Sequence, residues 1–140
     1  MLHMMKLAVG IRDLAHLAER QAARAVSDPP LRHQTRMFPR RAAEIVGKGS
    51  IYWVIAGVML VRQRIVGIRE EAYEDGTACA GLILDPRLVQ VEARPTRPFQ
   101  GWRYLTAEDA PPDLSASKSG RGAAAMPPAL RKELATLGLL

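Results

Sequence analysis

The feature that most constrains the fold is a series of short apolar segments separated by turn-forming residues. Residues 51–55 and 58–61 are rich in β-branched and aromatic side chains, and Ala56-Gly57 between them suits a tight turn or a bulge. Residues 77–84 form another apolar run, and residues 88–94 alternate apolar and polar side chains. Strands at this spacing predict a β-rich domain rather than repeated strand–helix–strand units.

Two helices are expected before these strands. Asp13 is placed to cap a helix that reaches about Val26, where two prolines follow. A second helix is expected over about residues 40–46, with Gly47 as its C-terminal cap. Short strands are expected at residues 4–9 and 33–38. We therefore predict an α+β fold, a small mixed β-barrel with two or three flanking helices.

The chain is expected to form one domain with a tail. Its 140 residues are enough for a single hydrophobic core. Residues 1–109 are predicted to be a globular α+β domain, and residues 110–128 a flexible linker, because they are rich in Pro, Ser and Gly. Residues 129–140 are predicted to form a short C-terminal helix.

Several classes of protein are disfavoured by composition. One cysteine in the chain argues against a disulfide scaffold and a cysteine-rich zinc site, and Cys79 lies in an apolar run where a buried thiol is expected. The histidines His3, His16 and His33 lack metal-ligand spacing, so we expect no metal and no cofactor. Without a long apolar run or a signal peptide, the protein is expected to be cytoplasmic and not bound to a membrane.

Positive charge is concentrated in one part of the chain. The whole sequence has a net charge of +6, and residues 32–64 alone carry seven basic side chains against one acidic side chain, Glu44. Arginine forks fit phosphate oxygens, so this pattern favours nucleic-acid binding, although a solvated basic face is the alternative. The candidate phosphate-binding residues are Arg36, Arg40, Arg41, Arg62, Arg64, Arg97 and Arg103.

Aromatic residues accompany these arginines. Residues 94–105 contain two prolines, a glycine and three aromatic side chains. Trp53, Trp102 and Tyr104 are therefore candidates for stacking against a nucleic-acid base. The structural alternative is that Phe99 and Trp102 plug the end of the barrel.

Two resemblances add to this interpretation. Residues 36–64, Leu84-Asp85-Pro86, residues 97–105 and residues 110–114 resemble an uncharacterised bacterial family, domain of unknown function 1489. The order of helix, hairpin and the Val66-Gly67-Ile68 strand is similar to PUA-like barrels of the ASCH and EVE type. That resemblance implies binding of RNA or modified bases in an aromatic-lined cleft. Some ASCH-type members are amidohydrolases, for which Lys48 and Glu44 are nominal candidates here.

Three functions follow as hypotheses. The first is a binding domain for RNA or a modified nucleobase without catalysis. The second is a small hydrolase acting on a nucleoside-like ligand. The third is a protein-interaction module, for example a homodimer, in which Phe99, Trp102 and Tyr104 are interface anchors.

Overall fold

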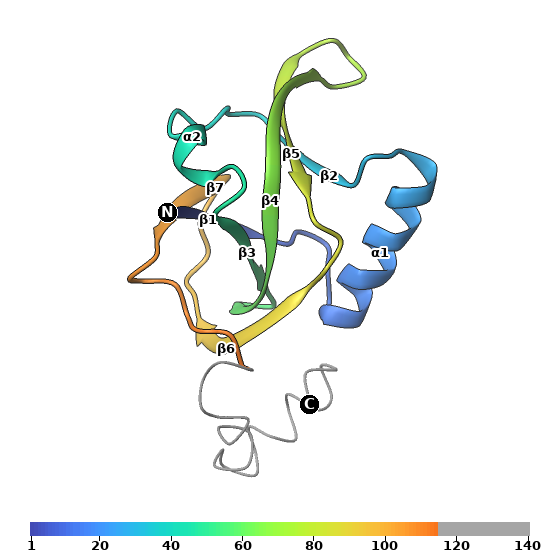
Figure 1. The fold of residues 1–140 in the computed structure, drawn as a ribbon. Helices are drawn as coiled ribbons and strands as arrows, with labels where there is room; N and C mark the ends of the chain where they lie inside the picture. Colours follow the sequence, from blue (N-terminus) through green and yellow to red (C-terminus); the bar gives the residue numbers. More distant parts are fainter. Residues whose placement is uncertain (115–140) are drawn as a thin grey trace.

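The computed structural model describes residues 1–114, which form two helices and seven strands (Figure 1). The predicted helix at 129–140 and most of the predicted linker lie outside these residues. The elements in chain order are β1 (Leu2–Leu7), α1 (Leu14–Ser27), β2 (Arg32–Thr35), α2 (Ala42–Ile45), β3 (Ser50–Ile55), β4 (Val58–Ala72), β5 (Ala78–Leu84), β6 (Val89–Pro95) and β7 (Trp102–Thr106).

The strands form one open mixed sheet. Its order is β2-β5-β4-β3-β1-β7, with β6 also paired to β4. Strands β1 and β3 are parallel, and every other described pair is antiparallel. The α+β class with a sheet and helices is thus confirmed, but the closed barrel predicted from the sequence is not, because the path of paired strands ends at β2 and β7.

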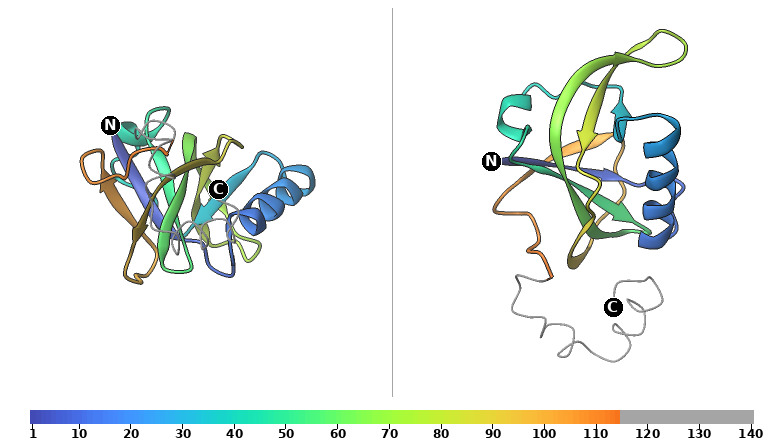
Figure 2. Two further views of the ribbon diagram at one scale, coloured as in Figure 1. Left: turned by 90° about the horizontal axis from the view of Figure 1, so that it is seen from below. Right: turned by 45° about the vertical axis from the view of Figure 1, so that its right-hand side comes forward.

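Strand β4 organises the sheet because it is long enough to serve two sets of partners. Its first part pairs with β3 on one edge and with β6 on the other, and its second part pairs with β5. Register shifts between Met59 and Val61 and between Ile65 and Gly67 interrupt these ladders. Irregularities of this kind bend a strand, and Figure 2 shows β4 strongly curved.

Helix α1 begins where the sequence predicts. The side chain of Asp13 accepts a hydrogen bond from the backbone N–H of His16 (2.8 Å), as an N-cap does. Leu14 and Leu17 are buried against the sheet, and the helix lies beside β2 (Figure 2). Within residues 1–114, neither helix has the length and apolar character needed to cross a membrane.

A buried amide connects α1 to the sheet. Gln63 of β4 has no exposed surface. Its Oε1 accepts hydrogen bonds from Trp53 Nε1 (2.8 Å) and Gln21 Nε2 (2.7 Å). Its Nε2 donates to Gln21 Oε1 (2.7 Å) and to the carbonyl of Asp85 (3.0 Å). All the hydrogen-bonding capacity of this amide is used, so its burial carries no unsatisfied group.

The two faces of the sheet carry separate apolar clusters. Met4, Ile51 and Trp53 belong to the larger cluster, which α1 and α2 cover with Leu14, Leu17 and Ile45. The smaller cluster lies on the other face and consists of Tyr52, Val54, Met59, Val91 and Leu105. Side chains of β3 therefore alternate between two buried environments, which explains why all six of its residues are buried.

The chain beyond β7 returns to β6. The N–H of Glu92 donates to the carbonyl of Pro112 (2.9 Å), and the N–H of Leu114 donates to the carbonyl of Gln90 (3.0 Å). Val91 and Asp113 are bridged between these bonds. Residues 112–114 of the predicted linker are thus joined to the sheet by backbone hydrogen bonds.

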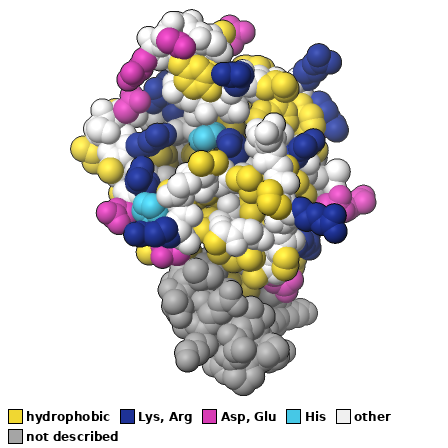
Figure 3. Space-filling model, turned by 180° about the vertical axis from the view of Figure 1, so that it is seen from behind, with side chains coloured by type: hydrophobic (Ala, Val, Ile, Leu, Met, Phe, Trp, Pro, Cys, Tyr) yellow, Lys and Arg dark blue, Asp and Glu magenta, His cyan; other side chains and the backbone are white. Residues whose placement is uncertain are grey.

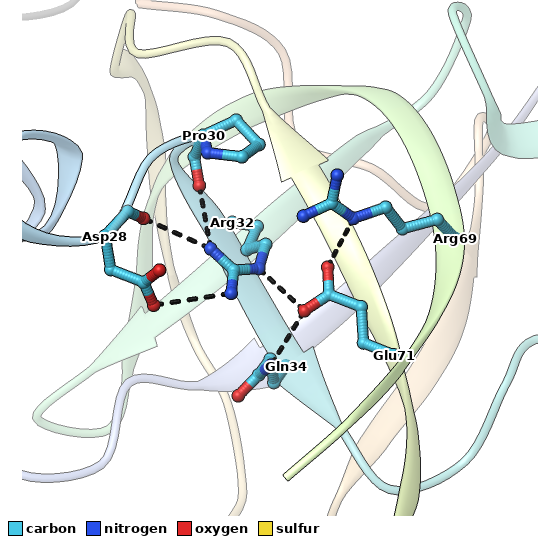
Figure 4. Close-up of polar contacts among 6 residues, drawn as sticks. All are labelled: Asp28, Pro30, Arg32, Gln34, Arg69 and Glu71. Carbon is cyan, nitrogen blue, oxygen red and sulfur yellow. Dashed lines mark hydrogen bonds and ion pairs between the residues drawn. The ribbon is translucent and has the colours of Figure 1, made fainter. Parts of the chain in front are cut away.

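A second polar cluster joins β2 to β4 across β5 (Figure 4). The Glu71 carboxylate accepts hydrogen bonds from Arg32 (2.7 Å), Gln34 (2.8 Å) and Arg69 (2.6 Å). Gly81 of β5 lies directly beneath it, and a Cβ at that position would be 2.0 Å from Glu71 Oε2. A side chain at residue 81 would displace the carboxylate from this position, because the carboxylate occupies the space of a Cβ.

We expect Gln63→Leu to lower the free energy of unfolding by about 3 kcal/mol, since it leaves the indole N–H of Trp53 and the Gln21 amide without their buried partner. Urea unfolding measures this loss. Gln100→Leu, at an exposed position, should change stability by no more than about 0.5 kcal/mol. Equal stability of the Gln63→Leu variant and the wild type would contradict the role given to this amide.

The free energy of unfolding should decrease at acid pH, because protonation of Glu71 weakens its hydrogen bonds in the folded protein. Burial acts to raise the pKa of Glu71, but the hydrogen bonds from Arg32, Arg69 and Gln34 outweigh it and lower the pKa to about 2. The stabilisation is therefore complete above the unfolded pKa of about 4.5 and is lost as the pH falls through about 2. It amounts to about 3 kcal/mol.

Unfolding measured between pH 5 and pH 2 tests this effect. Glu71→Gln should flatten the pH dependence, whereas Glu70→Gln, at an exposed neighbour on the same strand, should retain it. A Glu71→Gln variant with the wild-type acid dependence would show that other carboxylates cause the loss.

Candidate nucleic-acid interface

The structure divides the predicted site residues among three places. One group gathers around Trp102 and Tyr104 on β7. Arg62 and Arg64 lie apart from it, at a pocket beside β3 and β4. Trp53 is in the core. Seen from behind, Lys and Arg side chains are spread over the molecule, and most acidic side chains in view lie near its outline (Figure 3).

Trp102 and Tyr104 point to the same side of β7 and hold the β2–α2 connection. Their rings meet edge to face, with centroids 4.8 Å apart. The Trp102 indole N–H donates to the carbonyl of Met37 (3.0 Å), and the backbone N–H of Arg41 donates to Tyr104 Oη (3.2 Å). The Arg41 guanidinium also lies 5.6 Å from the centre of the Tyr104 ring. Both polar tips of these aromatics are therefore used within the chain.

A pocket of about 490 Å³ opens beside Trp102. Arg36 and Arg103 are exposed at its margins, and no acidic side chain of the described residues lines it. Met37 and Phe38 are exposed in the adjoining connection, with 68% and 41% of their surfaces accessible. The residues that line the pocket are Thr35, Arg36, Met37, Gln100, Gly101, Trp102 and Arg103. This pocket, which we call the β7 pocket, combines an aromatic ring with two arginines that form no ion pair among residues 1–114, and the Arg103 guanidinium lies 6.0 Å from the centre of the Phe99 ring.

The other predicted arginines differ in how far their charge is available. Arg40 and Arg97 are exposed in loops. Arg41 forms a two-bonded ion pair with Glu44 (2.6 and 2.8 Å). Arg62 forms a more buried one with Asp113, with both distances 2.7 Å. Positive charge that is already paired offers less attraction to phosphate, so Arg62 acts chiefly in the fold.

Trp53 is placed where no base can stack on it. Only 4% of its surface is accessible, and its N–H is bonded to Gln63. Its ring also meets His33 edge to face, with centroids 5.2 Å apart. We therefore leave Trp53 out of the interface predicted from the sequence, because stacking needs an open ring face.

A second pocket, of about 440 Å³, contains a polar cluster that sequence reasoning missed. His3 Nδ1 accepts a hydrogen bond from the backbone N–H of Ser50 (2.9 Å), and Arg62 Nη1 donates to Ser50 Oγ (2.9 Å). Tyr52 meets the His3 ring edge to face. The sequence does not indicate this cluster, because Asp113, which forms an ion pair with Arg62, lies in the segment predicted to be a linker.

This cluster is not arranged for nucleophilic catalysis. The lone pair of His3 Nδ1 is occupied by a backbone N–H, so the neutral ring carries its proton on Nε2 and has no free base nitrogen. Lys48 lines the pocket, whereas Glu44 does not and is paired with Arg41. Burial raises the pKa of the Cys79 thiol, which disfavours the reactive thiolate. Within residues 1–114, no three His, Cys, Asp or Glu side chains gather as metal ligands.

Comparison with known proteins identifies a family for this chain. A family model described as a protein of unknown function (DUF1489) matches residues 4–140. This agrees with the resemblance seen in the sequence and extends it beyond residue 114. The comparison with curated proteins and the comparison with solved structures give no match.

The titration of His3 checks the polar cluster. Burial lowers the pKa of His3 below 6.5, the charges of Arg62 and the N-terminus lower it further, and Asp113 acts in the opposite direction. In Arg62→Gln the positive charge is lost and Asp113 is left unpaired, so the pKa should rise. NMR pH titration of the His3 ring measures the change. Arg64→Gln is the matched control and should leave the titration as in the wild type, whereas a wild-type midpoint at or above 6.5 would contradict the geometry.

Proposed function

This chain belongs to the DUF1489 family of proteins of unknown function, and for this member we propose that the β7 pocket recognises RNA, with a base or modified base against Trp102. The observation that carries the proposal is the composition of the pocket. Trp102 and two exposed arginines, Arg36 and Arg103, line one pocket, and no acidic side chain of the described residues lines it. A flat base and the adjacent phosphates need this combination.

The geometry of the surrounding residues supports this assignment. The Trp102 ring is held in one orientation by its hydrogen bond to Met37 and its contact with Tyr104, so little rotational freedom is lost when a base docks. The pocket volume of about 490 Å³ lies within the range of small-ligand sites. Arg40 and Arg97 are exposed and would add weaker contacts to the phosphate backbone.

The sequence resemblance to PUA-like barrels suggests the same class of ligand, although the described strands form an open sheet rather than a closed barrel. Members of that superfamily mostly bind RNA or modified bases, and a cytoplasmic location is expected for such a protein. These expectations belong to the proposal and are tested with it.

Two other hypotheses are less well supported. A hydrolase needs a free base near a nucleophile, and the hydrogen bonds of His3 and Ser50 do not provide one. A homodimer would be anchored by Phe99, Trp102 and Tyr104, but Phe99 packs against the smaller apolar cluster, and Trp102 and Tyr104 already hold the β2–α2 connection. The exposed Met37 and Phe38 keep protein association as an outcome to be measured.

Binding to a labelled single-stranded RNA of roughly 12 nucleotides tests the proposal by fluorescence anisotropy over a range of salt concentrations. We expect affinity to fall as salt rises. Arg36→Gln and Arg103→Gln should each weaken binding, and each should reduce the slope of log affinity against log salt by about 0.7. Arg12→Gln removes an exposed charge outside the pocket and should leave the slope unchanged.

Tryptophan fluorescence locates the bound RNA. The chain has two tryptophans and Trp53 is buried, so quenching on binding should come from Trp102 and should disappear in Trp102→Phe. Light scattering on the same samples detects a dimer. Affinity that does not depend on salt, or wild-type affinity in both arginine variants, would overturn the proposal.

A further inference from the structure

A smaller pocket lies between α1 and the sheet. It has a volume of about 190 Å³, and Lys6 of β1, His33 of β2 and Trp53 of β3 contribute to its wall. Arg20, Gln21 and Arg24 of α1 line the opposite side. The pocket shares no lining residue with the β7 pocket. It is therefore a separate site, which we call the α1 pocket.

Three cations converge on this pocket without compensation. Arg20 and Arg24 are four residues apart on α1, so they lie on one face of the helix, and Lys6 faces them from β1. None of the three has an ion-pair partner among residues 1–114, and no acidic side chain of that range lines the pocket. Like charges brought together in this way repel one another unless an anion is bound between them.

His33 adds an unsatisfied polar group to the same wall. Its Nε2 is buried and has no hydrogen-bond partner among the described residues. Burial lowers the pKa of His33 to about 4, and the charges of Lys6 and Arg24 contribute to the lowering. The ring is thus neutral at pH 7. A buried polar atom without a partner is uncommon in a folded protein and calls for an explanation.

We propose that the α1 pocket binds a phosphate group. Two guanidinium groups and one ammonium group supply the positive charge and the donors that phosphate oxygens accept. At about 190 Å³ the pocket is smaller than the sites that enclose whole drug-sized ligands, so it takes the phosphate and leaves the remainder of the ligand outside. The conclusion rests on this pocket alone and does not require the RNA-binding proposal.

The α1 pocket and the β7 pocket are connected through neighbouring strands. Lys6 is paired across β1 and β7 with Trp102, so its backbone is directly beside that of the aromatic residue of the β7 pocket. The phosphate could therefore belong to a free anion or to the 5′ end of an RNA whose base is at Trp102. Both sources share the same chemistry in the pocket.

The first experiment uses inorganic phosphate, with chloride at the same ionic strength as the reference. Phosphate should raise the Tm of the wild type in a saturable manner. It should also raise the pKa of His33, followed by NMR, by about one unit, since a bound anion stabilises the charged ring and offsets the positive charges of Lys6 and Arg24. Arg20→Gln and Arg24→Gln should each weaken phosphate affinity about tenfold or more.

Arg87→Gln is the matched control, because Arg87 is exposed, lies outside the α1 pocket and should leave phosphate affinity unchanged. No saturable rise in Tm and an unmoved His33 titration would overturn the proposal. Equal phosphate affinity in the wild type, Arg20→Gln and Arg24→Gln would also overturn it.

A second experiment distinguishes the sources of the phosphate. RNA with a 5′-phosphate is compared with the same RNA bearing a 5′-hydroxyl. Tighter binding of the phosphorylated RNA, lost in Arg24→Gln, assigns the pocket to an RNA end. Equal binding of the two RNAs with saturable inorganic phosphate assigns it to a small phosphorylated ligand. The two proposals can fail separately. A protein that binds RNA but not phosphate overturns only the α1-pocket proposal, and one that binds phosphate but not RNA overturns only the RNA-binding proposal.

Discussion

The arrangement of the molecule depends on the buried amide of Gln63. Trp53, Gln21 and the carbonyl of Asp85 come from β3, α1 and the β5–β6 connection, and all three are bound to this one side chain. The bond to Gln21 fixes the rotation of α1 about its axis. Because Arg20 and Arg24 flank Gln21 on the helix, the same bond turns these two cations toward β1 and β2. A buried hydrogen bond in the core thereby sets the electrostatics of a surface pocket.

The shape of β4 explains why the basic segment does not form one surface. The net charge of residues 32–64 suggested a continuous patch. In the structure Arg36 is near β7, whereas Arg62 and Arg64 line a different pocket. Arg62 and Arg64 lie in the first part of β4, which pairs with β3, whereas Arg36 follows β2, which is joined to the second part of β4 through β5. Charge counted along a sequence becomes a site only where the fold brings the side chains together.

Local features of the fold were predictable from the sequence, and distant pairings were not. The Asp13 cap of α1 and the hairpin turn at Ala56-Gly57, where both residues have positive φ, depend on a few adjacent residues. The ion pair between Arg62 and Asp113 spans 51 positions, and no local pattern announces it. The burial of Trp53 likewise depends on Gln63 and Gln21. The sequence predicts Trp102 and Tyr104 as site residues. It does not predict that they bind Met37 and Arg41, because these contacts join residues more than 60 positions apart.

The return of residues 112–114 to β6 also affects how separate copies of the protein meet. An uncovered strand edge presents free backbone groups that can pair with another molecule and start aggregation. Here the backbone of 112–114 occupies part of the outer edge of β6, and the terminal strands β2 and β7 have only four and five residues. Short or covered edges leave little backbone for growth of a sheet between molecules. Among residues 1–114, the exposed Met37 and Phe38 are thus not accompanied by a long open strand edge.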